Sequence, residues 1–259
     1  MDLTGKRIVV TGAAGGIGLA MAKAALERGA EHAVLVDLDA ERVEAAAAAI
    51  GEQASAVAGD VADAALLKRA FETAGHVDGF FANAGIGTGT GLGDRDDWAA
   101  TMRVNIDAHI TAAQLLIPAW YERGAGLWVT TASAAGVLTQ IGDAPYSVSK
   151  AAAVAFAEWL AITYGDRGIQ VHCLCPMGVN TNLLNAGLDA DSQSVNVVAA
   201  AGRILEPDEV AQEVMAAIEA NRFMVLPHPE VAEFRRRKVD DTDRWLAGMR
   251  RLQSNVPGV

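Results

Sequence analysis

Short runs rich in valine and isoleucine alternate along the chain with longer, alanine-rich amphipathic stretches. Such alternation predicts a doubly wound α/β domain, in which parallel strands are covered by helices on both faces. Strands are expected at Arg7–Thr11, Ala33–Asp37, Ser55–Ala58, Gly79–Asn83, Leu127–Thr131, Gln170–Cys175 and Met224–Leu226.

The intervening helices are expected to begin near Gly16, Ala40, Asp63, Asp96, Pro145 and Pro207. Pro207 is followed by Asp208 and Glu209, and proline with carboxylates is typical of a helix first turn. Connections are short and no linker or repeat interrupts the pattern. One domain over residues 1–259 is therefore predicted, with a seven-stranded parallel sheet.

Two stretches depart from this rhythm. Residues 85–93 carry glycine at alternate positions, which disfavours regular structure and indicates either a flexible surface loop or a mobile rim of the active site. Residues 230–253 continue beyond the last strand with apolar side chains at helical spacing, which predicts a C-terminal amphipathic helix. That helix would close a pocket, contact a neighbouring subunit or complete its own core.

Composition narrows the function. The chain has 259 residues, is 51% hydrophobic and carries a net charge of −11, which argues against nucleic acid or an anionic membrane as partner. The basic run 235–238 is followed closely by aspartates and is interpreted as a solvated helix face. Two cysteines and five scattered histidines offer no disulfide framework and no metal site. With no signal peptide and no membrane span recognised, a cytoplasmic protein is expected.

A glycine-rich turn follows the first strand and opens the first helix. Gly12, Gly16, Ile17 and Gly18 lie in this turn, where backbone N–H groups and the positive helix end meet a pyrophosphate. Asp37 ends the second strand, where a carboxylate accepts hydrogen bonds from both adenosine ribose hydroxyls and repels a 2′-phosphate. Because the turn contains no arginine or lysine, NAD is predicted as the cofactor rather than NADP. Asp39 is assigned instead to capping the next helix.

Further polar groups follow later strands at the same edge of the sheet. Asp60 and Val61 follow the third strand, where they are expected beside the adenine ring. The fourth strand ends in Asn83, Ala84 and Gly85, again at the edge where open α/β sheets bind ligands.

Tyr146 and Lys150 are separated by four residues, which places both side chains on one helix face. An ammonium beside a phenol lowers the phenol pKa, and the tuned phenol is the acid or base that a carbonyl/alcohol interconversion needs. Ser133 lies thirteen residues before the tyrosine.

Together these motifs resemble the classical short-chain dehydrogenase/reductase family over nearly the full length. The matching residues are Thr11-Gly12-x-x-x-Gly16-x-Gly18, Asp60, Asn83-Ala84-Gly85, Asn105, Ser133, Tyr146-x-x-x-Lys150, Pro176-x-Gly178 and Thr181. The resemblance implies a Rossmann-type fold. It also implies that Tyr146 exchanges a proton with the substrate oxygen, Ser133 holds that oxygen, and Lys150 binds the nicotinamide ribose.

The resemblance assigns further roles. Asn105 would anchor a water that links Lys150 to solvent. Thr181 would contact the nicotinamide carboxamide, and Pro176, Gly178 and Val179 would shape the nicotinamide pocket. A homodimer or homotetramer is also implied, with the helices of Asn105 and Tyr146–Lys150 at the main interface.

Three segments should line the substrate pocket, by the same resemblance. They contribute Ile86, Ala134, Val137, Leu138, Gln140, Met177, Leu183 and Leu184. Because this set contains no arginine or lysine to clamp a carboxylate or phosphate, a hydrophobic, uncharged secondary alcohol or ketone is predicted. Gln140 would either bond a polar substituent or face water. Residues 180–205 are expected to form a mobile lid that ligand orders.

The sequence therefore predicts an NAD-dependent oxidoreductase. Two alternatives use the same fold, a catalytically silent dinucleotide-binding sensor or scaffold and a lyase or isomerase without net redox change.

Overall fold

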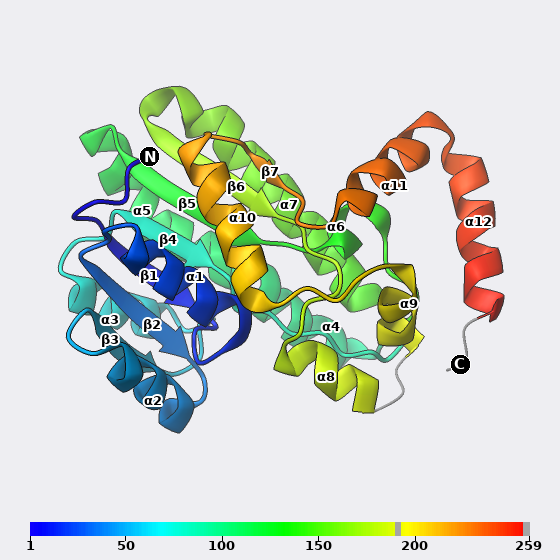
Figure 1. Ribbon diagram of the computed structural model, residues 1–259, viewed down its shortest axis with the longest axis horizontal. Coiled ribbons are helices and arrows are strands. Elements are labelled where there is room, and N and C mark those ends of the chain that lie inside the picture. The colour runs from blue at the N-terminus through cyan, green and yellow to red at the C-terminus, as the bar shows by residue number, and fades with distance from the viewer. Residues whose placement is uncertain (190–192, 256–259) are drawn as a thin grey trace.

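The computed structural model describes residues 1–189 and 193–255, and within them seven parallel strands form one sheet in the order β3-β2-β1-β4-β5-β6-β7 (Figure 1). The strands are β1 (Arg7–Thr11), β2 (His32–Asp37), β3 (Ala54–Ala58), β4 (Gly79–Ala82), β5 (Gly126–Thr131), β6 (Ile169–Leu174) and β7 (Met224–Val225). Every strand end lies within one residue of its predicted position, so the predicted α/β sheet is confirmed.

The helices are α1 (Gly16–Glu27), α2 (Ala40–Ile50), α3 (Ala64–Ala74), α4 (Arg95–Met102), α5 (Ala108–Arg123), α6 (Ala134–Leu138), α7 (Ala144–Tyr164), α8 (Asn182–Asp189), α9 (Gln193–Ala201), α10 (Pro207–Glu219), α11 (Pro229–Asp240) and α12 (Thr242–Asn255). The six predicted helix starts are confirmed to within one residue. None of the described helices has the length and apolarity needed to cross a bilayer.

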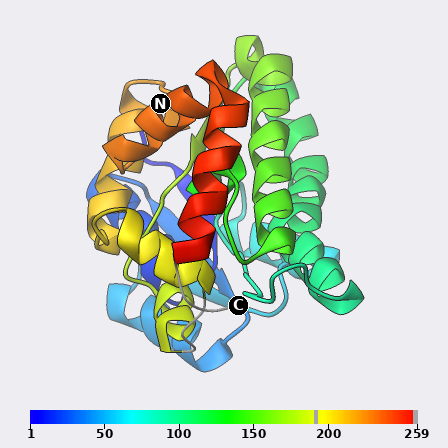
Figure 2. The same cartoon turned by 90° about the vertical axis from the view of Figure 1, so that its right-hand side faces the viewer.

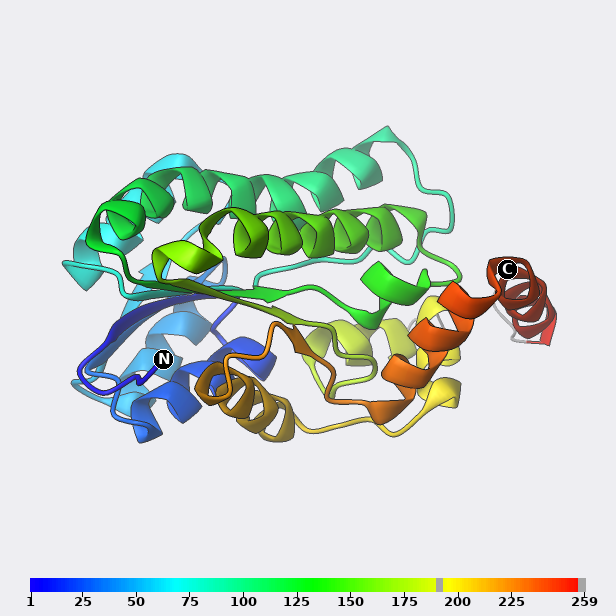
Figure 3. The ribbon, with the colours of Figure 1, turned by 90° about the horizontal axis from the view of Figure 1, so that it is seen from above.

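Alternate strand residues pack against opposite helix layers, as the strand repeat of two requires. Ile8 and Val10 of β1 pack in one cluster with α1, α2 and α10, whereas Val9 packs in another with α3, α5 and α7. Figure 3 shows α5 and α7 on one side of the sheet and α1 and α10 on the other. Both faces of the sheet are therefore buried, which explains the apolar character of the strands.

The strand order reverses between β1 and β4. From β1 the chain runs outward through β2 and β3, then returns to the other side of β1 to form β4 and continues to β7. In open α/β sheets, ligands bind at the carboxyl ends of the strands beside such a reversal.

The predicted C-terminal helix over residues 230–253 is wrong in one respect, because the segment forms two helices. Asp241 leaves the helical conformation at φ −153° and ψ 89°. Its carboxylate accepts from Arg244 N at 2.9 Å and so starts α12 as a new helix. Val231 of α11 is fully buried, whereas α12 has no buried residue and stands away from the sheet (Figure 1).

The predicted lid, residues 180–205, contains α8 and α9, although residues 190–192 lie outside the described part. Its two ends are held together, because Asn180 N donates to Leu205 O at 2.8 Å and Leu205 N donates to Gly178 O at 2.9 Å. The segment therefore leaves the body and returns at one point, which is the geometry of a flap. Its mobility remains a prediction.

Candidate active site

One cavity of about 1460 Å³ opens at the carboxyl ends of the strands. Its lining begins at the glycine turn after β1, passes Asp37 of β2, Asn83 after β4 and Ser133 after β5, and continues to the lid and the C-terminal helices. The cavity thus lies at the reversal of strand order, where the sequence placed its candidate groups.

The glycine turn fits a pyrophosphate. Gly12 and Gly16 have φ values of +65° and +54°, and a Cβ on Gly12 would lie 2.9 Å from Ala84 Cα. The N-cap of α1 is Gly15, which has no side chain to bond the first N–H groups of the helix. The positive end of α1 therefore faces the cavity without a side-chain cap.

Gly12, Gly16 and Ile17 line the cavity, whereas Gly18 does not. A Cβ on Gly18 would lie 2.2 Å from Gly12 O. The role of Gly18 is to let α1 pack closely against the turn, which is the third glycine's part in such motifs.

Asp37 lines the cavity beside this turn. Its carboxylate accepts from Ala14 N at 3.0 Å and from Asp39 N at 3.2 Å, which fixes its position. Asp39 accepts from Arg42 N at 3.1 Å, so its predicted capping of α2 is confirmed. These residues, with the bare helix end, fit a dinucleotide.

Arg42 also lines the cavity, and sequence reasoning missed it because only the glycine turn was searched for cations. Its guanidinium lies 3.0 Å from the position of a Cβ on Gly15. In the amide orientation that satisfies both groups, two Arg42 nitrogens donate to the Asn182 oxygen at 2.8 Å. Arg42 thus links α2, the glycine turn and the first residue of α8.

Asp60 and Val61 do not line the cavity. Asp60 accepts from Ala62 N at 2.9 Å and from Arg103 Nη1 at 2.6 Å, so it acts as a turn and ion-pair residue. Asn83 does line it, and its amide donates to Thr11 O at 3.0 Å and to Gly12 O at 3.2 Å. Asn83 therefore ties the end of β4 to the end of β1, beside Ala84 and Gly85.

Tyr146, Lys150 and Ser133 all line the cavity. Lys150 is buried and donates from Nζ to Thr131 O at 2.9 Å, with Nζ 5.6 Å from the centre of the Tyr146 ring. Ser133 Oγ accepts from Ala135 N at 3.1 Å and so also caps α6.

Burial raises the pKa of the Tyr146 phenol, while a hydrogen bond with Ser133 opposes the rise. Burial also lowers the pKa of Lys150 to about 8. The lowered phenol pKa predicted from the tyrosine–lysine spacing is therefore wrong for this structure, because loss of hydration outweighs the favourable interactions.

Asn105 lies behind this site. The helix that carries it widens into a π turn, Arg103–Asp107, and such turns occur frequently at functional sites. Asn105 Oδ1 accepts from Ile86 N at 2.8 Å, and its Nδ2 donates to Ile86 O at 2.8 Å and Ser149 Oγ at 3.0 Å. A Cβ on Gly85 would lie 3.0 Å from Lys150 Nζ and 3.2 Å from Asn105 Oδ1, so only glycine separates them.

Asp143 was missed by sequence reasoning. It is buried and caps α7, accepting from Tyr146 N at 2.9 Å. It also accepts from Thr88 N at 2.9 Å and Gly89 N at 2.7 Å. Asp143 therefore fixes the start of the catalytic helix against the glycine-rich loop, which lines the cavity and is a rim of this site. Aspartate two residues before Pro145 was the available signal.

The predicted substrate-lining residues divide into two groups. Those that line the cavity are Ala134, Leu138, Gln140, Met177, Leu183 and Leu184, and those that do not are Ile86 and Val137. Asn105 bonds both the backbone N–H and the backbone carbonyl of Ile86, and this residue lies outside the cavity lining. Gln140 Nε2 donates to Ser194 O at 3.1 Å, so its amide contacts α9.

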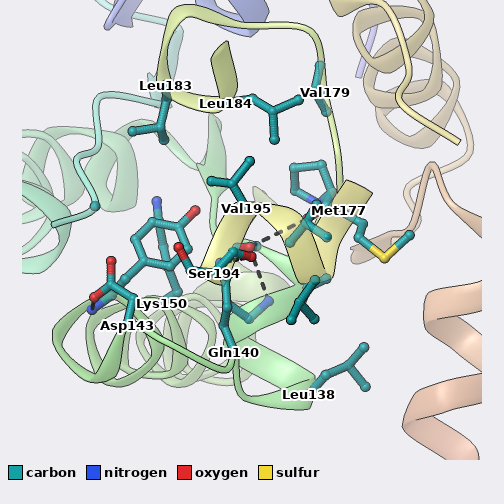
Figure 4. Close-up of a pocket in the computed structure, with 18 of the residues that line it drawn as sticks. Leu138, Gln140, Asp143, Lys150, Met177, Val179, Leu183, Leu184, Ser194 and Val195 are labelled. Carbon is teal, nitrogen blue, oxygen red and sulfur yellow. Dashed lines mark hydrogen bonds between the residues drawn. The ribbon is translucent and has the colours of Figure 1, made fainter. Parts of the chain in front are cut away.

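The predicted nicotinamide-pocket residues Pro176, Val179 and Thr181 line the cavity, whereas Gly178 does not. Figure 4 shows Leu183, Leu184 and Val179 on the lid side of the cavity, with Val195 between them and the side of Lys150 and Asp143. Apolar side chains thus stand opposite Lys150 and Asp143 across this part of the cavity.

The predicted set of lining residues is incomplete, because arginines outside it also line the cavity. Arg237, Arg244 and Arg251 line the cavity at its far end. Their position depends on the fold of the tail, which spacing alone did not reveal. Within the described residues, no group of three or more histidine, cysteine or acidic side chains could hold a metal ion.

A family model described as short chain dehydrogenase matches residues 6–191. The chain is 35% identical over 222 residues to a 2,5-dichloro-2,5-cyclohexadiene-1,4-diol dehydrogenase of Sphingobium indicum, covering 82% of this chain and 88% of the relative. It is 33% identical over 219 residues to a D-threitol dehydrogenase of Mycolicibacterium smegmatis, covering 81% and 84%. A crystal structure of a short chain dehydrogenase/reductase from Burkholderia phymatum in complex with NAD has a TM-score of 0.84 at 28% identity, covering 94% of this chain and 96% of that one.

Proposed function

The chain belongs to the short-chain dehydrogenase family, and from this premise we propose that it is an NAD-dependent oxidoreductase interconverting a secondary alcohol on a hydrophobic body and its ketone. One observation carries the proposal. Tyr146, Lys150 and Ser133 line the same cavity as the glycine turn and Asp37, so a proton-transfer group and a dinucleotide site share one space. Relatives named as dehydrogenases of a cyclohexadiene diol and of D-threitol support the reaction class.

NAD is proposed because Asp37, held by two backbone N–H groups, is placed to accept from ribose hydroxyls and repels a 2′-phosphate. The structural relative that contains NAD supports this choice. Bound NAD would supply the hydride-transfer chemistry that this chain lacks, in either direction of the reaction.

The chain's own residues control the proton. Ser133 hydrogen-bonds the substrate oxygen and holds it near Tyr146. In reduction the Tyr146 hydroxyl gives its proton to that oxygen, and in oxidation the phenolate removes it. Lys150 stands beside the phenol and anchors the ribose side of the site. The apolar wall formed by Leu184 and Val195 excludes water from the reacting carbon.

The direction of the Tyr146 pKa shift has a kinetic consequence. Because burial raises the pKa of this phenol, the protonated form dominates near neutrality. Ketone reduction is then expected to run readily at neutral pH, whereas alcohol oxidation should quicken as the pH rises.

The test is turnover of a panel of hydrophobic secondary alcohols with NAD, followed by NADH absorbance. Tyr146→Phe should lower kcat by about 10²–10⁴-fold, because it removes the general acid–base group. Its affinity for NAD should be unchanged in calorimetry. The matched control is Tyr164→Phe, at the other end of α7, which should retain full activity.

Retained turnover in Tyr146→Phe would contradict the proton-transfer role. The same assay is run with NADP, and a wild-type preference for NADP would overturn the argument from Asp37.

A further inference from the structure

The cavity extends past the catalytic residues to a wall formed by α12. We call this part the outer arm, lined by Arg244, Trp245, Gly248, Met249, Arg251 and Leu252. These positions recur at intervals of three and four residues, so a single face of α12 borders the cavity. Figure 2 shows α12 crossing the end of the molecule near α8 and α9.

This face is mixed in character. Trp245, Met249 and Leu252 alternate with Arg244 and Arg251, and no residue of α12 is buried. A face that packed on the protein's own core would be uniformly apolar, and a face that met only water would be polar. A mixed face bordering a cavity suits an amphipathic ligand.

The arginines that border the cavity from α11 and α12 differ in whether they have an acidic partner. Arg237, which also borders the cavity from α11, is paired with Glu233 at 2.8 Å. Within residues 1–189 and 193–255, Arg244 and Arg251 make no ion pair. Arg244 and Arg251 thus bring two cations without an acidic partner to the cavity of a chain whose net charge is −11.

Two carboxylates, those of Asp240 and Asp241, line the cavity as well and have other partners. Asp240 bonds Arg236 at 3.3 Å, and Arg236 does not line the cavity. Asp241 accepts from Arg244 N as the cap of α12. Neither carboxylate forms an ion pair with the guanidinium of Arg244 or Arg251.

Gly248 adds an independent observation. A glycine inside a helix costs about 1 kcal/mol relative to alanine. A Cβ placed on Gly248 would have Arg251 Nη2 as its nearest neighbour, at 3.9 Å. The glycine therefore relieves no clash within the chain, but it leaves the backbone of α12 open to a ligand between Arg244 and Arg251.

The volume of the cavity is consistent with an elongated substrate. A cavity of about 1460 Å³ exceeds the roughly 300–1,000 Å³ of an ordinary small-molecule site. A dinucleotide and an elongated substrate can therefore occupy it together.

We propose that the outer arm binds the anionic end of an amphipathic substrate, a carboxylate or phosphate held by Arg244 and Arg251, while the hydroxyl of the same molecule reaches Tyr146. Guanidinium groups suit this ligand because their planar forks bond carboxylate and phosphate oxygens in pairs. The inference rests on the proposed function for the reacting end and extends it to the far end. The hydrophobic body lies along Trp245, Met249 and the lid.

The experiment compares a medium-chain fatty acid that carries a secondary hydroxyl near its methyl end with the methyl ester of the same acid. The wild type should prefer the acid in kcat/KM by about tenfold or more, since a charge-assisted hydrogen bond contributes about 1.5–3 kcal/mol. Arg244→Ala with Arg251→Ala should remove this preference by lowering kcat/KM for the acid to about the value for the ester. The matched control is Arg250→Ala, on the same helix and outside the lining, which should keep the preference.

A second arm separates this inference from the proposed function. Binding of decanoate, which cannot react, is measured by calorimetry with NAD present. It should weaken about tenfold or more in the double variant and not in Arg250→Ala. If no alcohol is oxidised but decanoate behaves in this way, the proposed function fails and the anion site stands.

Three results would overturn the inference. One is a wild-type preference for the ester over the acid. Another is an equal loss of decanoate affinity in Arg250→Ala. The effect would then come from the overall positive charge of α12 and not from Arg244 and Arg251. The third is a double variant that alters sedimentation while decanoate binding is unchanged, which would make this face of α12 a contact with a second copy of the chain.

Discussion

Lys150 and His109 are buried basic side chains, and the charge of Lys150 acts on the pKa of His109. Neither ring nitrogen of His109 has a hydrogen-bond partner in the described part of the chain. Burial, with the Lys150 charge as a second cause, lowers the pKa of His109 to about 3. The histidine is therefore neutral in the folded protein at neutral pH and adds no second positive charge beside Lys150.

This shift predicts a pH dependence of stability. Unfolded histidine titrates near pH 6.5, so between pH 6.5 and about 3 the unfolded state binds a proton that the folded state does not. The His109 contribution is fully present above pH 6.5 and is lost as the pH falls toward 3. Relative to His109→Leu, the wild type should lose about 3 kcal/mol of unfolding free energy between pH 7 and pH 4.

Urea unfolding at a series of pH values measures this difference. His76→Gln, at a half-exposed histidine, is the control and should follow the wild type. If the unfolding free energies of wild type and His109→Leu fall in parallel with pH, then His109 does not cause the loss of stability in acid.

At the scale of elements, α11 and α12 differ in what they contribute. Val231 of α11 is fully buried, and this helix contacts α6 beside the site. Trp245 of α12 is partly buried, lies 6.1 Å from Phe234 between ring centres, and packs at the edge of the small cluster that contains Val231. We therefore expect the fold to depend more on α11 than on α12.

A chain that ends at Asp241 should consequently fold and bind NAD as the full chain does, with Tm lowered by no more than about 4 °C, since about 1 kcal/mol corresponds to 2–4 °C at this size. The Tm of a chain that ends at Pro229 should fall much further, because this chain lacks the buried side chain of Val231. Thermal unfolding of the two truncated chains decides the point. A large loss of Tm in the chain that ends at Asp241 would show that α12 contributes substantially to the stability of the fold.

Local signals explain which elements the sequence could predict. Apolar runs and capping residues predicted the strands and the six helix starts. The four-residue spacing predicted that Tyr146 and Lys150 lie on one helix, and both are in α7. Contacts between distant segments carried no such signal. Asp143 bonds Thr88 from 55 residues away, Arg42 reaches Asn182, and the arginines of the outer arm reach the cavity only after the tail has folded back.

At the scale of the whole molecule, the outer surface of α5 and α7 is unusually apolar. Tyr164 contacts Tyr121 and Trp159 edge-on, at 6.2 and 5.8 Å between ring centres. Trp159 is 53% exposed and Ile162 is 84% exposed. On the same helix, α7, Ala151 and Ala155 are exposed, whereas Ala153 and Ala157 are buried in the protein's own core.

We expect this surface to join subunits of a homodimer or homotetramer. Exposed aromatic clusters mark such contacts, and a net charge of −11 would otherwise keep chains apart. Ile162→Glu should shift the protein toward monomer in sedimentation, because a carboxylate would lose hydration at the interface. Val239→Glu, at a residue 76% exposed on α11, should leave the assembly unchanged. A wild type that sediments as a monomer would contradict the expectation.

The break at Asp241 separates the outer arm, with the two arginines of the proposed anion site, from the rest of the cavity lining along the chain. The residues proposed to handle the proton and the dinucleotide all precede it, and the helix that follows it has no buried residue. That helix is thus an interchangeable module. Grafting a different one after Asp241 would give the same catalyst a new preference, and natural variation confined to these last residues would diversify the molecules accepted without disturbing the reaction.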